Sequence, residues 1–138
     1  MKNKPLQKKL IEILGDRCSF SESARNTYAR GEDIFDPILP DCVVFPKNNQ
    51  EVSSILKMCN EHKTPVVPYG TGTSLEGNVV GIKNGVTISL ENMNKILSVN
   101  AEDFDCRVQS YVTREQLNEH LRNEGIFFPI DPGANASL

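Results

Sequence analysis

The stretch that decides the fold is residues 65–78, which read PVVPYGTGTSLEGN. Val66 and Val67 lie between two prolines, and this short apolar run predicts a buried strand. The strand leads directly into a loop of glycines and hydroxyl side chains. Closely spaced glycines let backbone N–H groups approach an anion, and the hydroxyls add further donors. The loop is therefore a candidate pyrophosphate site, although a glycine-rich turn that only reverses the chain is the competing interpretation.

Two familiar phosphate loops do not fit this stretch. A P-loop counted from Gly72 reaches Gly77 but continues with Asn78 where it needs lysine. A dinucleotide fingerprint counted from Gly70 needs a third glycine where Leu75 stands. A nucleotide bound here is therefore held by a different architecture.

The segments before the loop alternate between predicted strands and helices. Residues 42–45 form an apolar run closed by proline, and residues 49–59 carry an apolar stripe at helical spacing. Together with residues 65–68 they predict a strand–helix–strand unit whose strands are parallel neighbours. Further helices are expected at residues 5–14 and 21–28.

The second half of the chain is expected to consist mainly of strands. Predicted strands lie at residues 86–90, 96–100, 104–112 and 126–130. The first of them alternates apolar and polar residues, which predicts one solvent-exposed face. Thr113 to Gln116 form a capping box that begins a helix, and Gly125 is expected to end that helix.

Composition restricts the class of protein. The 138 residues carry 15 Lys and Arg against 18 Asp and Glu, a net charge of −3, and the basic residues are scattered. A nucleic-acid partner is therefore not expected, because phosphate binding requires clustered positive charge. No apolar run is long enough for a transmembrane segment. The four cysteines have no paired spacing and are expected to be free thiols of a cytoplasmic protein.

Spacing alone indicates no catalytic or metal-binding constellation. His62 and His120 have no ligand at a suitable spacing, so both are interpreted as surface histidines. The acidic residues at 102–105 match no calcium loop and are interpreted as a solvated turn. We therefore predict no catalytic residue and no metal site in this chain.

Residues 66–77 resemble the first FAD-binding loop of the FAD-linked oxidases, the vanillyl-alcohol oxidase/p-cresol methylhydroxylase superfamily. Within it, the chain is similar to the D-lactate dehydrogenase (cytochrome) and glycolate oxidase flavin-subunit branch. Further motifs follow in the family's order at Pro40–Pro46, Asn92–Leu97, Ala101–Asp103, Thr113–Asn118 and Phe127–Ala134.

The resemblance implies an α/β (α+β) fold, namely an FAD-binding PCMH-type domain. The chain would hold its N-terminal βαβ subdomain and the start of the second subdomain, and it looks truncated. Residues 1–40 are expected to be a helical and irregular lead segment, and residues 41–138 the FAD-binding domain, incomplete at its C-terminus. The implied function is the FAD-binding portion of an FAD-dependent 2-hydroxy-acid dehydrogenase of the D-lactate/glycolate type.

The resemblance also assigns residues to the cofactor, chiefly through backbone amides around the pyrophosphate. The cofactor-binding residues it implies are Pro68, Tyr69, Gly70, Thr71, Gly72, Thr73, Ser74, Leu75, Gly77, Val112, Thr113, Pro132, Gly133 and Ser137. The loop contains no His or Cys for covalent attachment, so FAD is expected to bind non-covalently. One position departs from the pattern: Ser110 and Tyr111 stand where the family has Pro-Gly. We expect the Tyr111 side chain to crowd the cofactor or to change the backbone angle.

The family's substrate domain is not among these residues, so the chain alone is expected to be inactive. The alternatives are a truncated non-catalytic remnant, or half of a split enzyme that needs a separate substrate-domain chain. The expected partners are FAD, a 2-hydroxy acid in the intact enzyme only, and an electron acceptor. Through this acceptor the protein could associate with a membrane. An unfinished sheet edge at the C-terminus predicts self-association.

Overall fold

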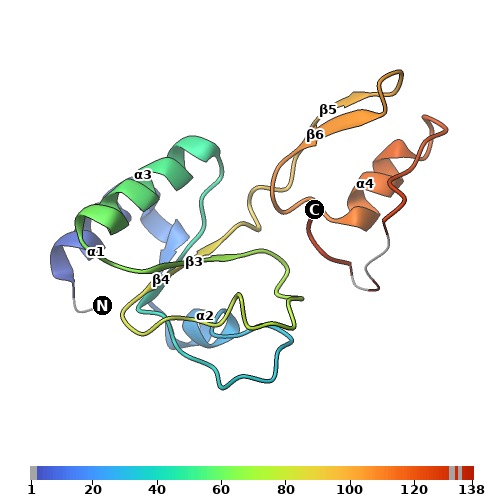
Figure 1. Ribbon diagram of the computed structural model, residues 1–138. Helices are drawn as coiled ribbons and strands as arrows, with labels where there is room; N and C mark the ends of the chain where they lie inside the picture. The colour runs from blue at the N-terminus through green and yellow to red at the C-terminus, as the bar shows by residue number, and fades with distance from the viewer. Residues whose placement is uncertain (1–2, 131–132, 134) are drawn as a thin grey trace.

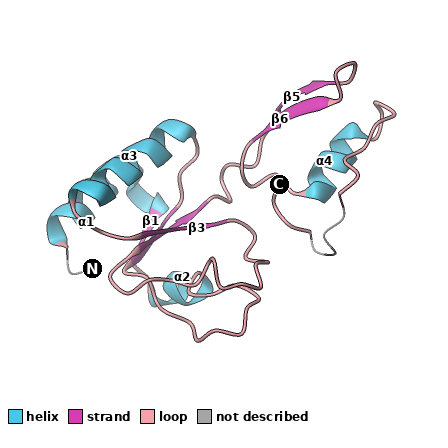
Figure 2. Ribbon diagram, in the orientation of Figure 1, coloured by secondary structure: helices cyan, strands magenta, loops and turns pink. Residues whose placement is uncertain are grey.

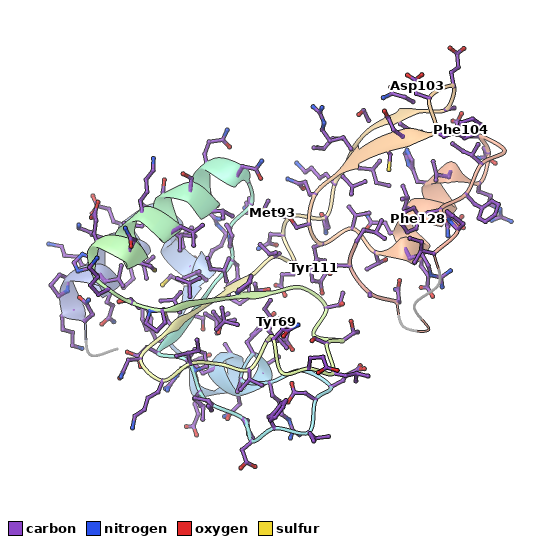
Figure 3. The ribbon with its side chains drawn as sticks, viewed as in Figure 1. Tyr69, Met93, Asp103, Phe104, Tyr111 and Phe128 are labelled. Atoms are coloured by element: carbon purple, nitrogen blue, oxygen red, sulfur yellow. The ribbon has the colours of Figure 1, made fainter. Side chains whose placement is uncertain are left out.

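The computed structural model describes residues 3–130, 133 and 135–138. Its elements form two lobes (Figure 1), and Met93 lies where they join (Figure 3). The first lobe, residues 3–91, contains a mixed sheet with helices on its faces, and the second lobe, residues 94–138, contains a β-hairpin and one helix. This mixture of helices and strands confirms the predicted α/β (α+β) class.

The sheet of the first lobe contains β1 (Cys18–Ser19), β2 (Cys42–Val44), β3 (Val66–Tyr69) and β4 (Val86–Ser89). The strand order is β1-β2-β4-β3, in which β2, β4 and β3 are parallel and β1 is antiparallel to β2. The predicted strand–helix–strand unit is present, but its two strands are not neighbours because β4 lies between them. The short strand β1 was not predicted.

The position of β4 corrects a second expectation. All four of its residues are buried, including the polar Thr87 and Ser89, so the solvent-exposed face predicted from alternation is wrong. A central strand of a parallel sheet is covered on both faces, and threonine and serine are small enough to be accommodated there. In this strand, the alternation of apolar and polar residues therefore does not indicate which side chains are exposed to solvent.

Two helices cover one face of the sheet (Figure 2): α1 (Lys4–Leu14) and α3 (Asn49–Glu61). Leu6 and Leu10 of α1 and Ile55 of α3 are fully buried in one apolar core with the strands. The short helix α2 (Glu22–Thr27), predicted within residues 21–28, lies toward the other face. A single 3₁₀ turn, η1 (Gly15–Arg17), connects α1 to β1.

The second lobe consists of β5 (Ile96–Asn100), β6 (Asp105–Val108) and α4 (Arg114–Leu121). The strands form an antiparallel hairpin, and Val112, Leu117 and Leu121 form the small core beneath it. Strand β6 is shorter than the predicted 104–112, since Phe104 has a φ of 55° and belongs to the turn. The predicted capping box is confirmed at Thr113, whose side chain accepts the backbone N–H of Gln116 at 3.2 Å.

Residues 126–130 do not form the predicted final strand. The side chain of Asn118 satisfies the backbone there: its Oδ1 accepts the N–H of Phe128 at 2.7 Å, and its Nδ2 donates to the Phe128 carbonyl at 3.2 Å. A side chain therefore replaces the strand partner. Helix α4 ends at Leu121, four residues before the predicted end at Gly125. The chain there tightens into a turn in which Glu124 N–H donates to the Leu121 carbonyl.

The four cysteines are free thiols, as predicted, and Cys106 is exposed whereas the other three are buried. Within the described residues, no helix combines the length and the apolar character needed to span a bilayer.

Candidate functional site

The glycine-rich loop begins where β3 ends, at the carboxyl end of the parallel strands (Figure 2). In open α/β sheets this edge is where ligands bind, because loops from neighbouring strands converge there. The loop runs from Gly70 to Asn78 without regular structure and returns to the sheet through β4. The tertiary structure therefore places the loop where an anion site is expected.

The backbone donors of this loop are available. None of the N–H groups of residues 70–78 donates a hydrogen bond to another described residue, although Gly72 is itself buried. Gly72 is the one buried residue of this run, and a buried backbone N–H almost always has a partner. A run of unpaired donors at the end of a strand fits an anionic ligand such as a pyrophosphate, which accepts several N–H hydrogen bonds at once. The residues present thus fit the phosphate part of FAD.

A side chain at either of two loop glycines would meet a neighbouring side chain. A Cβ built on Gly70 would lie 2.5 Å from Ser137 Oγ, and a Cβ on Gly72 would overlap the hydroxyl of Tyr69. Gly72 also has a φ of 80°, which favours glycine. Gly72 is therefore favoured by its backbone conformation, whereas a side chain at Gly70 would require the Ser137 hydroxyl to move.

The loop is held from outside by a segment that sequence reasoning missed. Glu32 N–H donates to the Gly72 carbonyl at 3.0 Å, and the Tyr69 hydroxyl donates to the Arg30 carbonyl at 3.0 Å. Gly31 lies so close to the loop that a Cβ there would be 2.5 Å from the Gly72 oxygen. The only signal in the sequence was a glycine within an otherwise irregular segment.

An aromatic cluster lies under the loop. Tyr28 makes edge contacts with Phe45 and Tyr69, at centroid distances of 5.6 and 4.9 Å. Its hydroxyl donates to Glu91 Oε2 at 2.5 Å. Burial, followed by this hydrogen bond to Glu91, raises the pKa of Tyr28 to about 12. Burial also raises the pKa of Tyr69, with a contribution from nearby Tyr111. Both phenols stay neutral over the physiological range.

The C-terminal segment returns to the loop. Ser137 N–H donates to Thr71 Oγ1 at 3.4 Å, and the Thr71 and Thr73 hydroxyls are also 3.4 Å apart. Ser137 forms an antiparallel bridge with Thr113, and Leu138 N–H donates to the carbonyl of Val112 at 2.9 Å. The structure thus brings together three separately predicted segments, around residues 71, 113 and 137.

The other residues that the resemblance assigns to the cofactor have more varied positions. Val112 is fully buried in the core of the second lobe, and Thr113 uses its side chain to cap α4. Leu75 is 67% exposed at the outer side of the loop, and Gly133 is exposed. Pro132 lies outside the described residues. Pro68, Ser74 and Gly77 belong to the loop or to the strand before it, and Gly77 lies against the ring of Phe35.

Tyr111 lies at the junction of the two lobes, as Figure 3 shows. It is not among the residues with a positive φ, so this position does not require glycine for its backbone conformation. Three backbone hydrogen bonds connect it to the loop: Tyr111 N–H to Met93, Met93 N–H to Leu90, and Leu90 N–H to Tyr69, at 2.9, 2.7 and 2.9 Å. The tyrosine is therefore accommodated, and its position is tied to the start of the loop.

An apolar cavity of about 530 Å³ borders the site. It lies between α3 and the ends of β3 and β4, and its lining includes Leu56, Pro68, Leu90 and Met93. Because Pro68 lies two residues before Gly70, the cavity offers an apolar space near the unpaired N–H groups. In the described part of the chain, no group of three or more potential metal ligands comes together.

Comparison with known proteins identifies the class. A family described as FAD binding domain matches residues 40–137. The chain is 42% identical over 127 residues to "Probable D-lactate dehydrogenase, mitochondrial" of Danio rerio, covering 91% of this chain and 26% of that protein. It is 40% identical over 137 residues to the Arabidopsis thaliana protein named mitochondrial D-lactate dehydrogenase (cytochrome), covering 98% and 24%. Glycolate oxidase subunit GlcD of Bacillus subtilis is 31% identical, covering 97% and 29%.

Solved structures agree on the fold. An alkyldihydroxyacetonephosphate synthase superposes with a TM-score of 0.89 at 22% identity, covering 98% of this chain and 28% of that chain. A p-cresol methylhydroxylase superposes with a TM-score of 0.74 at 24% identity, covering 89% and 25%.

The chain therefore belongs to the FAD binding domain family of the FAD-linked oxidases. Within that family its curated relatives are D-lactate dehydrogenases and a glycolate oxidase subunit, which confirms the branch expected from the motifs. The chain spans about a quarter of the length of these relatives, at 26%, 24% and 29%.

Proposed function

We propose that the loop from Pro68 to Gly77 binds the pyrophosphate of FAD through its backbone N–H groups, without a covalent bond to the flavin. The single observation that supports this most is that no N–H of residues 70–78 has a partner among the described residues. Thr71, Thr73 and Ser137 provide hydroxyls beside these donors. The loop contains no lysine or arginine, so backbone dipoles carry the recognition rather than fixed charge.

The proposal includes the other assigned segments in supporting roles. Val112 and Thr113 hold the C-terminal segment through the bridge to Ser137, and this places Ser137 against Gly70. Pro132 and Gly133 precede this segment in the chain. We infer that Tyr111 borders the cofactor from the junction between the lobes and narrows the space that a glycine would leave.

In an intact enzyme of this branch, the flavin would supply hydride-accepting chemistry for the oxidation of a 2-hydroxy acid. This chain's contribution is to hold the cofactor: the loop orients the pyrophosphate, and the half-buried tyrosines beneath it remain uncharged. A base and a carboxylate-binding group for the substrate are not among the residues that we assign. We therefore propose that the chain alone does not oxidise D-lactate or glycolate, which a dye-reduction assay with FAD added would test.

The test of the proposed function is a titration of the purified chain with FAD, followed by flavin fluorescence. FAD and ADP both contain a pyrophosphate and are expected to bind and to compete. FMN and riboflavin lack it and are expected to bind at least about tenfold more weakly. If FMN binds as tightly as FAD, or if ADP does not compete, the loop is not the pyrophosphate site.

Loop variants make the test specific. Gly70→Ala places a methyl group against Ser137 Oγ, and Gly72→Ala places one against the Tyr69 hydroxyl, so both are expected to weaken FAD binding. Gly125→Ala is the matched control, because Gly125 has a similar φ of 71° but nothing within 4 Å of the added Cβ. A complete lack of FAD binding by the folded wild-type chain would instead favour a non-catalytic remnant.

Other expectations remain predictions. The domain boundary near residue 40 and the need for a separate substrate-domain chain belong to this proposal. The cytoplasmic location also stays a prediction. The names of two relatives do not support it, because they contain the word "mitochondrial".

A further inference from the structure

The segment that follows α2 runs beside the glycine-rich loop that follows β3 (Figure 1). Its backbone is hydrogen-bonded to the loop region at more than one point. Glu32 N–H donates to the Gly72 carbonyl at 3.0 Å, and beyond the loop Gly81 N–H donates to the Ala29 carbonyl at 2.9 Å. Residues 29–35 therefore hold the loop in its middle and just after its end.

Two residues of this segment lie in close contact with the loop backbone. A Cβ built on Gly31 would lie 2.5 Å from the carbonyl oxygen of Gly72 and 3.3 Å from that of Ser74. A Cβ built on Gly77 would lie 2.6 Å from the ring of Phe35. Gly31 and Phe35 are therefore two points at which the position of the segment affects the path of the loop.

The carboxylate of Asp33 connects these two contact residues. Its Oδ2 accepts the N–H of Gly31 at 3.1 Å, and its Oδ1 accepts the N–H of Phe35 at 3.0 Å. One side chain thus fixes the backbone two residues before it and two residues after it. Hydrogen bonds to an ionised acceptor are stronger than those between neutral groups, so this carboxylate is well suited to hold the segment in one conformation.

We propose that Asp33 is a positioning residue of the cofactor site. Its carboxylate sets the conformation of residues 31–35, and these residues set the conformation of the loop that binds the pyrophosphate. This inference rests on the proposed function, because it takes the loop to be the FAD site. Asp33 precedes residue 40, at which the family match begins. Part of the cofactor-binding machinery therefore lies in the segment expected from the sequence to be a helical and irregular lead.

The charge of Asp33 and its hydrogen bonds have opposite effects on an anionic ligand. Burial raises the pKa of Tyr69, and the neighbouring Tyr111, Asp33 and Glu32 add to this, so the charge of Asp33 reaches the start of the loop. A pyrophosphate is an anion, and a nearby carboxylate repels it. A role through charge alone predicts that removing the charge strengthens FAD binding, whereas a positioning role predicts that losing the hydrogen bonds weakens it.

Three variants test this difference in the FAD titration. Asp33→Ala removes the charge and both hydrogen bonds and is expected to weaken FAD binding at least about tenfold. Asp33→Asn removes the charge but keeps one acceptor oxygen, so it is expected to weaken binding by only about threefold. Asp36→Asn is the matched control and is expected to leave binding unchanged. Asp36 is exposed and makes no hydrogen bond or ion pair with another described residue.

Amide NMR spectra of the ligand-free chain provide a second readout, which does not require FAD. Asp33→Ala is expected to shift the amide resonances of Gly72 and Gly77 and to leave those of β4 in the sheet unchanged. A residue that only stabilised the fold would lower the free energy of unfolding without moving the resonances of the two loop glycines. Asp36→Asn is expected to move neither set.

The proposal is overturned if Asp33→Ala leaves the resonances of Gly72 and Gly77 in their wild-type positions. It is also overturned if Asp33→Ala binds FAD as tightly as the wild type or more tightly. If the wild-type chain does not bind FAD, the proposed function fails for this chain, and the resonances alone decide whether Asp33 sets the loop conformation. If Asp33→Ala does not fold, Asp33→Asn serves for both comparisons, because it retains one of the two acceptors.

Discussion

Replacing Gly72 by alanine tests whether the loop depends on the contact with Tyr69. The added methyl group overlaps the Tyr69 hydroxyl, so the ring has to move. Its movement breaks the 3.0 Å hydrogen bond to the Arg30 carbonyl and disturbs the edge contact with Tyr28. We expect both losses to lower the free energy of unfolding.

The magnitude follows from these contacts. A left-handed backbone costs alanine about 1–2 kcal/mol, and the stiffer unfolded chain offsets about 0.4–1 kcal/mol of this. The lost hydrogen bond adds about 1 kcal/mol, and the disturbed aromatic contact adds about 0.5–1 kcal/mol. Gly72→Ala should therefore lower the free energy of unfolding by about 2–3 kcal/mol, and the control Gly125→Ala, which meets no atom, by about 0.5–1 kcal/mol.

Urea unfolding of both variants, followed by circular dichroism, measures this difference. If FAD binds only when the loop has its native conformation, Gly72→Ala should also weaken FAD binding about 30-fold. The reasoning is refuted if the two variants lose the same stability within about 0.5 kcal/mol, since the Tyr69 contact would then contribute nothing. Unchanged FAD affinity in a destabilised Gly72→Ala chain would separate the loop conformation from cofactor binding.

Three further predictions concern the first lobe and the thiols. Glu51→Gln removes the paired hydrogen bonds to Arg17, at 2.5 and 2.8 Å, and should lower the free energy of unfolding by about 1–2 kcal/mol. Because the Arg17 guanidinium lowers the pKa of Glu51, this stabilisation should be complete above about pH 4.3 and decline as the pH falls further, which acid unfolding of wild type and variant will show. Tyr28→Phe removes the hydrogen bond to Glu91 and should cost about 1 kcal/mol. Since the pKa of Tyr28 is raised to about 12, the stability gained from the neutral phenol should be present below about pH 10 and be lost as the pH rises toward 12, as alkaline unfolding will test. Ellman's reagent should label Cys106 rapidly in the folded chain and the three buried thiols only on unfolding; rapid labelling of two or more would contradict the described packing.

The sequence by itself determined the local elements and the family. The start of α4 followed from a cap whose chemistry is local, since Thr113 accepts the N–H of Gln116. The glycine spacing in the loop indicated an anion site because backbone access depends on the residues of the loop itself. The motifs that follow it in order identified the FAD-linked oxidases, which the comparisons confirmed.

The tertiary structure alone decided which segments meet. Strand order is a long-range property, so the insertion of β4 between β2 and β3 and the burial of Thr87 and Ser89 could not be inferred from local alternation. The support that Glu32 gives to Gly72 also joins residues far apart in sequence. Residues 126–130 carry a strand-like pattern, yet they form no strand because Asn118 of α4 takes up the backbone groups of Phe128. Local pattern describes what a segment can form, whereas the partner that reaches its hydrogen-bonding groups decides what it does form.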